Sequence, residues 1–378
     1  MFKWFDKNEV NTGRQIEFDY MKGIFMVLIY LIHVFQGTLS KESIVASSAY
    51  IFNSMLGAAM FIFIMGFGTA YSRSGSPKNY CISGIKLIIY QYLNDFALVA
   101  ALMLPYPFIR ASLSEKSESI MHMLVEIYIQ YTNIFFISGI IYLIIALLKK
   151  LKTPLAIYIL IGTAVSIAAP FVFGKPVDVP VLGYLVQLMI GDAPHVSFTP
   201  LYFLPYALFG MAIGKLYRHV KDKKQFYLML TPVCAVIAIV WWVIFLSRVG
   251  INFDAIRKQS AEGYICPNLW HAIASIAHIL LMAAVVYFIA GRGKTPKKEP
   301  GNPVSRQLLY YSRHISKFYA IHTVVYNFMF AVHGYQGFET WQCWILMIVC
   351  MVVTEAVVRG YNKVYDLIQN RRKVKENG

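Results

Sequence analysis

Three ionisable side chains near the start of the chain share one apolar segment, RQIEFDYMKGIFMVLIYLIH. Lys22 and His33 are eleven residues apart, which is three helical turns plus about 20°, so they share one face about 16 Å apart. Asp19 lies within about 40° of that face. Because an imidazole exchanges its proton near pH 7, this face predicts proton-transfer chemistry at one end and fixed charge at the other. The structural alternatives are a lysine that reaches the membrane interface and a histidine hydrogen-bonded to another helix.

Two more segments carry polar side chains at helical spacing. They are Lys86, Tyr90 and Asn94 in the segment at 80–104, and Glu126, Gln130 and Asn133 in the segment at 121–148. Residues three or four apart fall on one helical face, so each set forms a polar stripe. Hydrogen bonds between helices would explain one stripe. Two stripes favour a hydrated cavity.

A late apolar segment at 308–333 contains Tyr319 and His322. His322 is sixteen residues beyond Arg306, which marks the charged side, so its depth is comparable to that of His33. We interpret two histidines at one depth on different helices as parts of one site. The nine histidines form neither HxH nor HExxH, so no metal site is predicted.

The elements that carry these side chains must lie in a membrane. Of the 378 residues, 58% are hydrophobic and 14% are charged, whereas soluble domains have about 45–50% apolar and about 25% charged residues. This composition excludes the soluble, disordered and collagen-like classes. A bilayer core of about 30 Å needs about 20 apolar residues per helix. The segments that qualify are 18–37, 48–71, 80–104, 121–148, 154–174, 198–217, 226–247, 267–290, 308–333 and 341–362.

An open sheet edge in lipid would leave backbone groups unpaired, so we predict an all-α polytopic membrane protein with about ten transmembrane helices. The apolar piece at 181–191 is too short to span and is predicted to be re-entrant or interfacial. We predict one membrane domain over 1–378, with a cytoplasmic N-terminal segment at 1–17 and a basic cytoplasmic tail at 364–378.

The charges between the segments predict the orientation. Lys and Arg alternate from loop to loop, with 23 on one side and seven on the other. The positive-inside rule places the richer side, and with it both termini, in the cytoplasm. The same pattern explains the net charge of +16 without nucleic acid as a partner. Short loops and the absence of a glycosylation sequon favour a bacterial cytoplasmic membrane.

The opening segment resembles the first helix of the acyltransferase family 3 membrane proteins. That helix has an arginine, an aspartate about five residues on, a basic–Gly–Ile step, an apolar run and a histidine. The matching residues here are Arg14, Asp19, Lys22-Gly23-Ile24 and His33. The family's second basic residue, an arginine, is Lys22 in this chain, and lysine lacks the planar fork that binds phosphate bidentately.

Two other stretches agree with this resemblance. MFIFIMGFGTAY is similar to the family's second helix, and SRHISKFYAIHTVVYNF to its late segment, with Ser316, Tyr319 and His322. The family's Arg-x-x-Arg pair at the third helix is reduced here to Lys86. FIFIMG also resembles the heparan-alpha-glucosaminide N-acetyltransferase-like group of the same superfamily. Because no histidine occurs at 38–47, where that group has one, the first family is preferred.

The resemblance implies a membrane acyltransferase that moves an acyl group, usually acetyl, from cytoplasmic acyl-CoA to a hydroxyl or amine. The acceptor would be an extracytoplasmic glycan or a related small molecule. The residues implied for the CoA pyrophosphate are Arg14, Lys22, Arg73 and Lys86. The pantetheine arm would follow the polar stripes and Tyr319. His33 would be a general base or carry the acyl group, Asp19 would brace Lys22, and His322 would orient the acceptor or stabilise the oxyanion.

Two other functions remain open. A proton-coupled transporter or flippase is the main alternative, because ten helices with buried Asp, Lys, Glu and His also suit a carrier. The other is a signalling or scaffold membrane protein in which every polar residue is structural. The chain has no internal repeat, which argues against a transporter built from duplicated halves.

Overall fold

The computed structural model describes residues 4–38, 44–72, 75–109, 115–130, 132–175, 179, 182–191, 199–265, 267–290, 302–333 and 338–376. Every regular element in these ranges is a helix, which confirms the all-α prediction. The helices are α1 (Ile16–Thr38), α2 (Ile44–Gly68), α3 (Pro77–Met103), α4 (Tyr106–Ile109), α5 (Glu115–Gln130), α6 (Ile134–Lys150), α7 (Leu155–Val172), α8 (Leu182–Ile190), α9 (Pro200–Tyr217), α10 (Lys223–Val249), α11 (Phe253–Ile265), α12 (Leu269–Ala290), α13 (Pro303–Arg313), α14 (Ile315–His333) and α15 (Thr340–Glu376).

Seven of the described helices are long and apolar enough to cross a membrane. They cover Ile16–Phe35, Ser48–Gly68, Pro77–Ile109, Leu155–Val172, Lys223–Val249, Leu269–Ala290 and Thr340–Arg371. Each overlaps one of the ten predicted segments. The other three segments overlap α6, α9 and α14, which are not among these seven. The count of ten and the cytoplasmic placement of both termini therefore stay predictions.

Two of the ten segments were wrong as single helices. The segment at 121–148 is broken because α5 ends at Gln130 and α6 begins at Ile134. Asn133 caps α6, its side-chain oxygen accepting the Phe135 N–H at 2.8 Å, and such a cap satisfies an amide that starts a new helix. The segment at 308–333 is divided at His314, between α13 and α14. The short apolar piece at 181–191 forms α8, a separate helix of nine residues.

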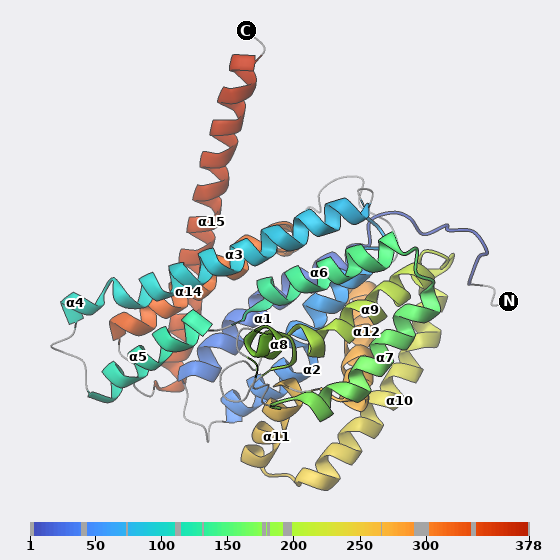
Figure 1. Cartoon of the computed structure of the whole chain (residues 1–378), viewed down its shortest axis with the longest axis horizontal. Coiled ribbons are helices and arrows are strands. Elements are labelled where there is room, and N and C mark those ends of the chain that lie inside the picture. The colour runs from blue at the N-terminus through green and yellow to red at the C-terminus, as the bar shows by residue number, and fades with distance from the viewer. Residues whose placement is uncertain are drawn as a thin grey trace.

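The centre of the bundle is the contact between α2 and α9, with α7 and α12 packed around it (Figure 1). A Cβ added at Gly66 of α2 would lie 2.0 Å from the Ala207 carbonyl oxygen. One added at Gly210 of α9 would lie 2.2 Å from the Phe63 carbonyl oxygen. Small residues let membrane helices approach closely, so these two glycines set the α2–α9 crossing.

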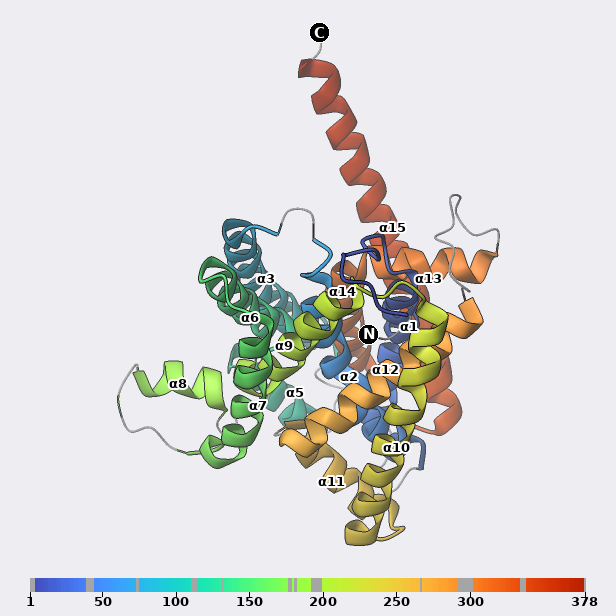
Figure 2. The same cartoon turned by 90° about the vertical axis from the view of Figure 1, so that its right-hand side faces the viewer.

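The two ends of the described chain are placed differently. The N-terminal segment lies against the turn after α9, because the Asp6 N–H donates to the His219 carbonyl at 2.8 Å and the Lys221 N–H to the Trp4 carbonyl at 2.9 Å. By contrast, α15 continues well beyond the other helices, as both views show (Figure 1, Figure 2). Side chains along this last part, such as Val364, are exposed.

Candidate active site

Asp19 joins two predicted cationic residues, Arg14 just before α1 and Lys22 within it, to a distant helix. Its carboxylate is 2.8 Å from Lys22 Nζ and also pairs with the Arg14 guanidinium. Ser312 Oγ of α13 donates to the same carboxylate at 3.2 Å. The helices can come this close because Gly23 faces the α13 backbone, where an added Cβ would lie 2.2 Å from the Leu308 oxygen. Residues that the sequence separates by almost 300 positions thus meet at one carboxylate.

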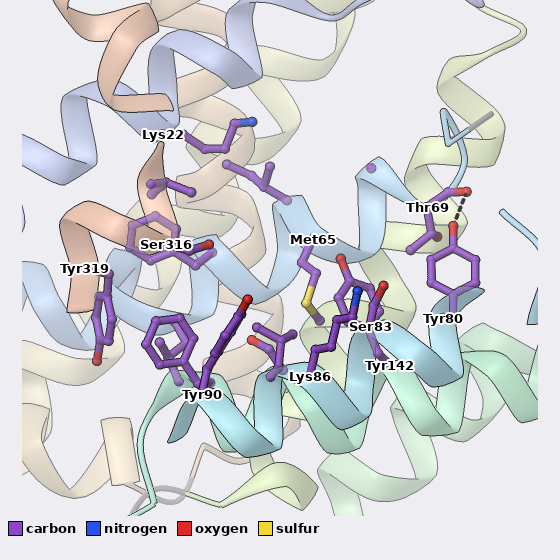
Figure 3. Close-up of a pocket in the computed structure, with 18 of the residues that line it drawn as sticks. Lys22, Met65, Thr69, Tyr80, Ser83, Lys86, Tyr90, Tyr142, Ser316 and Tyr319 are labelled. Atoms are coloured by element: carbon purple, nitrogen blue, oxygen red, sulfur yellow. Dashed lines mark hydrogen bonds between the residues drawn. The ribbon is translucent and has the colours of Figure 1, made fainter. Parts of the chain in front are cut away.

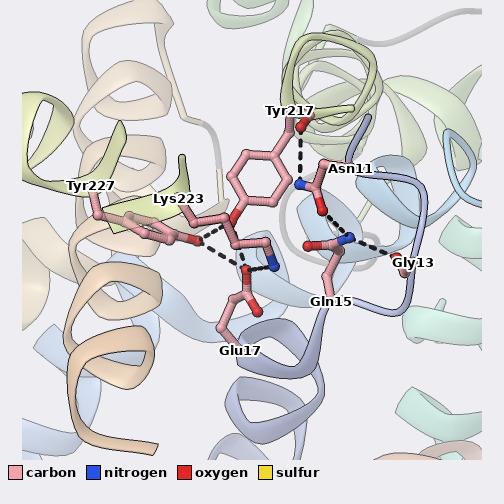
Figure 4. Close-up of polar contacts among 7 residues, drawn as sticks. All are labelled: Asn11, Gly13, Gln15, Glu17, Tyr217, Lys223 and Tyr227. Atoms are coloured by element: carbon pink, nitrogen blue, oxygen red, sulfur yellow. Dashed lines mark hydrogen bonds and ion pairs between the residues drawn. The ribbon is translucent and has the colours of Figure 1, made fainter. Parts of the chain in front are cut away.

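A buried carboxylate that the sequence analysis missed holds the start of α1 (Figure 4). Glu17 is 1% exposed and accepts hydrogen bonds from Tyr217 Oη at 2.6 Å and Lys223 Nζ at 3.0 Å. Tyr227 Oη lies 3.0 Å from Tyr217 Oη and completes the cluster. Since Tyr217 ends α9 and the other two partners are on α10, Glu17 fixes the rotation of α1 and so the direction in which its Asp19–Lys22 face points.

The two predicted histidines lie side by side. The ring centroids of His33 on α1 and His322 on α14 are 5.2 Å apart. The rings of Tyr30 and Tyr319 pack edge-on against the His322 ring, with ring centroids 5.3 and 5.4 Å from its centroid. His322 is 1% exposed, and its Nδ1 lies 3.1 Å from the Phe318 carbonyl oxygen. A carbonyl only accepts, so Nδ1 carries the proton and Nε2 keeps its lone pair.

A cavity of about 600 Å³ lies between α1, α2, α3, α6 and α14 and is here named the long cavity (Figure 3). It follows α3 from Tyr80 to Tyr90, ten residues that span about 15 Å of helix. Lys86 lies between these tyrosines on α3, and Lys22 reaches the cavity from α1. The cavity is therefore elongated and carries two ammonium groups.

Tyr319 connects the long cavity to the histidine pair. It lines the cavity at the end where Tyr90 lies (Figure 3), and its ring packs edge-on against Phe135 of α6 at 5.4 Å. The same ring contacts His322. A ligand that fills the cavity would thus end against the ring that adjoins the two imidazoles.

The polar stripes contribute unequally to this cavity. Lys86 and Tyr90 line it, but Asn94, which is 6% exposed, and Asn133 are not among the residues lining it. The backbone N–H of Asn133 donates to Gln91 Oε1 at 3.1 Å, and Gln91 Nε2 donates to Asp95 Oδ2 at 2.6 Å. This network joins α3 to the start of α6, so Asn133, the last residue of the second stripe, has a structural role.

One predicted residue is remote from the histidines, and others lie outside the residues that the structure describes. Asp19 is fourteen residues before His33 on α1, or about 21 Å along the helix, so its contacts favour positioning Lys22 over direct catalysis. Arg73 and the side chains of Glu126 and Gln130 lie outside the described residues. Tyr80 and Ser83 line the cavity and were missed. The signal was present for Ser83, which is three residues before Lys86 on the same helical face, whereas Tyr80 lies about 120° away from Lys86 around the helix.

Together these features define a polytopic membrane protein with a candidate group-transfer site inside its helix bundle. The chain matches the family model described as an acyltransferase domain over residues 15–358. It belongs to acyltransferase family 3, as the opening motif indicated, and is a membrane acyltransferase. The resemblance to the heparan-alpha-glucosaminide N-acetyltransferase-like group is not confirmed by this match. No curated protein and no solved structure matches the chain significantly.

Proposed function

We propose that the protein transfers an acyl group, acetyl in the simplest case, from cytoplasmic acyl-CoA to a hydroxyl or amine of an extracytoplasmic glycan or related small molecule. The proposed setting is a bacterial cytoplasmic membrane. The observation that carries this proposal is the long cavity, which ends at Tyr319 beside the paired rings of His33 and His322. An extended arm that bears a reactive thioester at its tip has the shape that such a cavity accepts.

The cationic residues are proposed to attract and hold the donor. Lys22 and Lys86 line the long cavity and offer charge to an anionic ligand. Arg14 and Asp19 act through Lys22, because the Asp19 carboxylate pairs with both the Arg14 guanidinium and the Lys22 ammonium group. Arg73, which the family resemblance adds to this set, is proposed on that ground alone.

The reaction exchanges the C–S bond of the thioester for a C–O or C–N bond. As the acceptor oxygen or nitrogen attacks the carbonyl carbon, the imidazole of His33 takes its proton, the C–S bond breaks, and the proton passes to the departing thiolate. In the two-step form of this reaction, an imidazole nitrogen of His33 attacks the thioester, the C–S bond breaks, and the departing thiolate takes the imidazole proton. The acceptor then attacks the acyl-imidazole, the C–N bond to His33 breaks, and the acceptor's proton returns to the imidazole. His322 has its proton on Nδ1, bound to the Phe318 carbonyl. Its Nε2 therefore suits accepting a hydrogen bond from the acceptor rather than stabilising an oxyanion.

The test is titration of the detergent-purified protein with acetyl-CoA, beside Lys22→Ala and His33→Ala. We expect Lys22→Ala to lose at least about tenfold in affinity, because a charge-assisted contact is removed, and His33→Ala to bind like the wild type. Lys224→Ala and His122→Ala, both at exposed positions, are the matched controls. If folded wild-type protein binds neither acetyl-CoA nor longer acyl-CoAs, the acyl-CoA proposal is wrong and the carrier hypothesis takes its place.

A further inference from the structure

A second cavity, of about 640 Å³, lies where α2, α6 and α9 end and α3 begins, and is here named the basic pocket. Lys149, Lys215 and Arg218 line it, together with the Ser76 that caps α3. Glu9 is the one carboxylate among the described residues that line it, and it pairs with Arg218. The pocket therefore carries a surplus of positive charge, which an anion would neutralise.

The two lysines are available to such an anion. Lys149 Nζ donates to the Thr69 carbonyl at 3.2 Å, and Lys215 Nζ lies 4.5 Å above the Tyr158 ring. In the described part of the chain, neither ammonium forms an ion pair with a carboxylate. Lys215 and Arg218 are close enough to act electrostatically on Lys149. A bound anion would relieve this repulsion without displacing an internal acidic partner.

The basic pocket and the long cavity meet. Thr69 and Ser72 line both. At this junction Tyr80 Oη donates to the Thr69 carbonyl at 3.3 Å, and Lys149 Nζ lies 4.7 Å above the Tyr80 ring. From Tyr80 the long cavity runs about 15 Å along α3 toward Tyr319. A cationic compartment, an elongated passage and a pair of imidazoles thus follow one another in space.

We propose that the basic pocket binds the phosphate groups at the nucleotide end of the acyl donor, with Lys149 and Lys215 as phosphate contacts. The donor's arm then occupies the long cavity, and its thioester lies at Tyr319. This inference rests on the proposed function and extends it: Lys22 and Lys86 remain contacts of the donor in the long cavity, and Lys149 and Lys215 add a second set of cations that holds the phosphates. Anionic lipid headgroups carry the same phosphate chemistry and are the competing source.

The experiment compares Lys149→Gln and Lys215→Gln in the full-length protein in detergent, with calorimetric titration of acetyl-CoA, adenosine 3′,5′-bisphosphate and pantetheine. Each variant should bind acetyl-CoA about tenfold more weakly, because it loses a charge-assisted bond to phosphate. The bisphosphate should compete with acetyl-CoA in the wild type, and pantetheine affinity should not change. Lys150→Gln, at the exposed neighbouring position, is the matched control, and Lys215→Arg should restore binding because it keeps the charge.

The outcomes separate this inference from the proposed function. Wild-type affinity for acetyl-CoA in both Gln variants would overturn the phosphate site and leave the proposed function standing. Competition by phosphatidylglycerol in mixed micelles, with none by the bisphosphate, would assign the pocket to a lipid headgroup and also overturn it. Absence of acyl-CoA binding to the folded wild-type protein would overturn both.

Discussion

At the scale of single residues, the surroundings of the histidine pair decide its chemistry. Two imidazoles with ring centroids 5.2 Å apart repel each other when both are charged, and tyrosine rings rather than carboxylates adjoin them among the described contacts. The two rings are therefore not both charged at once, and a neutral imidazole is the form that removes a proton from an acceptor or attacks a thioester. With Nδ1 of His322 bound to a backbone carbonyl, the ring is also held in one orientation.

This arrangement predicts that His322→Asn abolishes most acyl transfer without weakening the binding of the donor. We expect consumption of acetyl-CoA by membranes containing the variant to fall at least about 100-fold, the usual scale for losing a proton-transfer or orienting group. The free thiol released from the donor measures this consumption. The affinity for the donor should stay within about twofold of the wild-type value. His122→Asn, on the exposed face of α5, is the control. Unchanged turnover with weakened donor binding would instead make His322 a donor-binding residue.

The sequence predicted which side chains lie close together where depth and periodicity carry the information. His33 and His322 could be paired because each lies a countable distance from a charged helix end. Lys86 and Tyr90 followed from a stripe, and extending that stripe backward would have added Ser83. The basic pocket could not be predicted in this way, because Lys149 and Lys215 lie at the ends of different helices and read individually as ordinary loop charges.

At the scale of elements, the position of α1 depends on polar contacts at its first turn. Glu17, which is almost fully buried, is stabilised by Tyr217 Oη and Lys223 Nζ, from two other helices. Burying a carboxylate is costly unless it is hydrogen-bonded and paired, so these partners make the site tolerable. The carboxylate in turn sets the helix that carries Asp19, Lys22 and His33.

Tyr217→Phe removes one of these partners and keeps the ring packing. The free energy of unfolding should fall by about 1–3 kcal/mol, the cost of leaving a buried charged group short of one hydrogen bond. Denaturant unfolding of the detergent-purified protein followed by tryptophan fluorescence measures this change. Tyr365→Phe, on the exposed part of α15, should change stability by less than about 0.5 kcal/mol. An equal effect of both substitutions would show that Glu17 does not depend on Tyr217.

The helix breaks show why element boundaries were harder to predict than the elements. The residues around Asn133 and His314 include neither glycine nor proline, so the residues that usually mark the end of a helix are missing. The first break is stabilised by Gln91, which is 42 residues away in sequence and accepts the Asn133 N–H. A contact with a residue so far away in the sequence does not change the hydrophobic periodicity of the segment itself. The apolar runs alone therefore predicted continuous helices.

At the scale of the whole molecule, the number of crossings fixes which surfaces face which side. If α6, α9 and α14 cross together with the seven longer helices, the crossings are even and both termini share one side. If only the seven cross, the termini lie on opposite sides. The loop charges favour the even number, because the positive-inside rule then holds along the chain. The proposed direction of transfer depends on the same count.

The positions 150 and 175, on either side of α7, distinguish these topologies directly. Counting from a cytoplasmic N-terminus, ten crossings place Lys150 in the cytoplasm and Lys175 outside, whereas seven reverse the two. We expect Lys175→Cys, in a background without native cysteines, to react with a membrane-impermeant maleimide on intact cells, and Lys150→Cys to react only after lysis. Both side chains are exposed, so accessibility to the reagent does not bias the comparison. The opposite labelling pattern would contradict ten crossings, and it would place Lys149 on the other side of the membrane from the α2–α3 turn with which it lines the basic pocket.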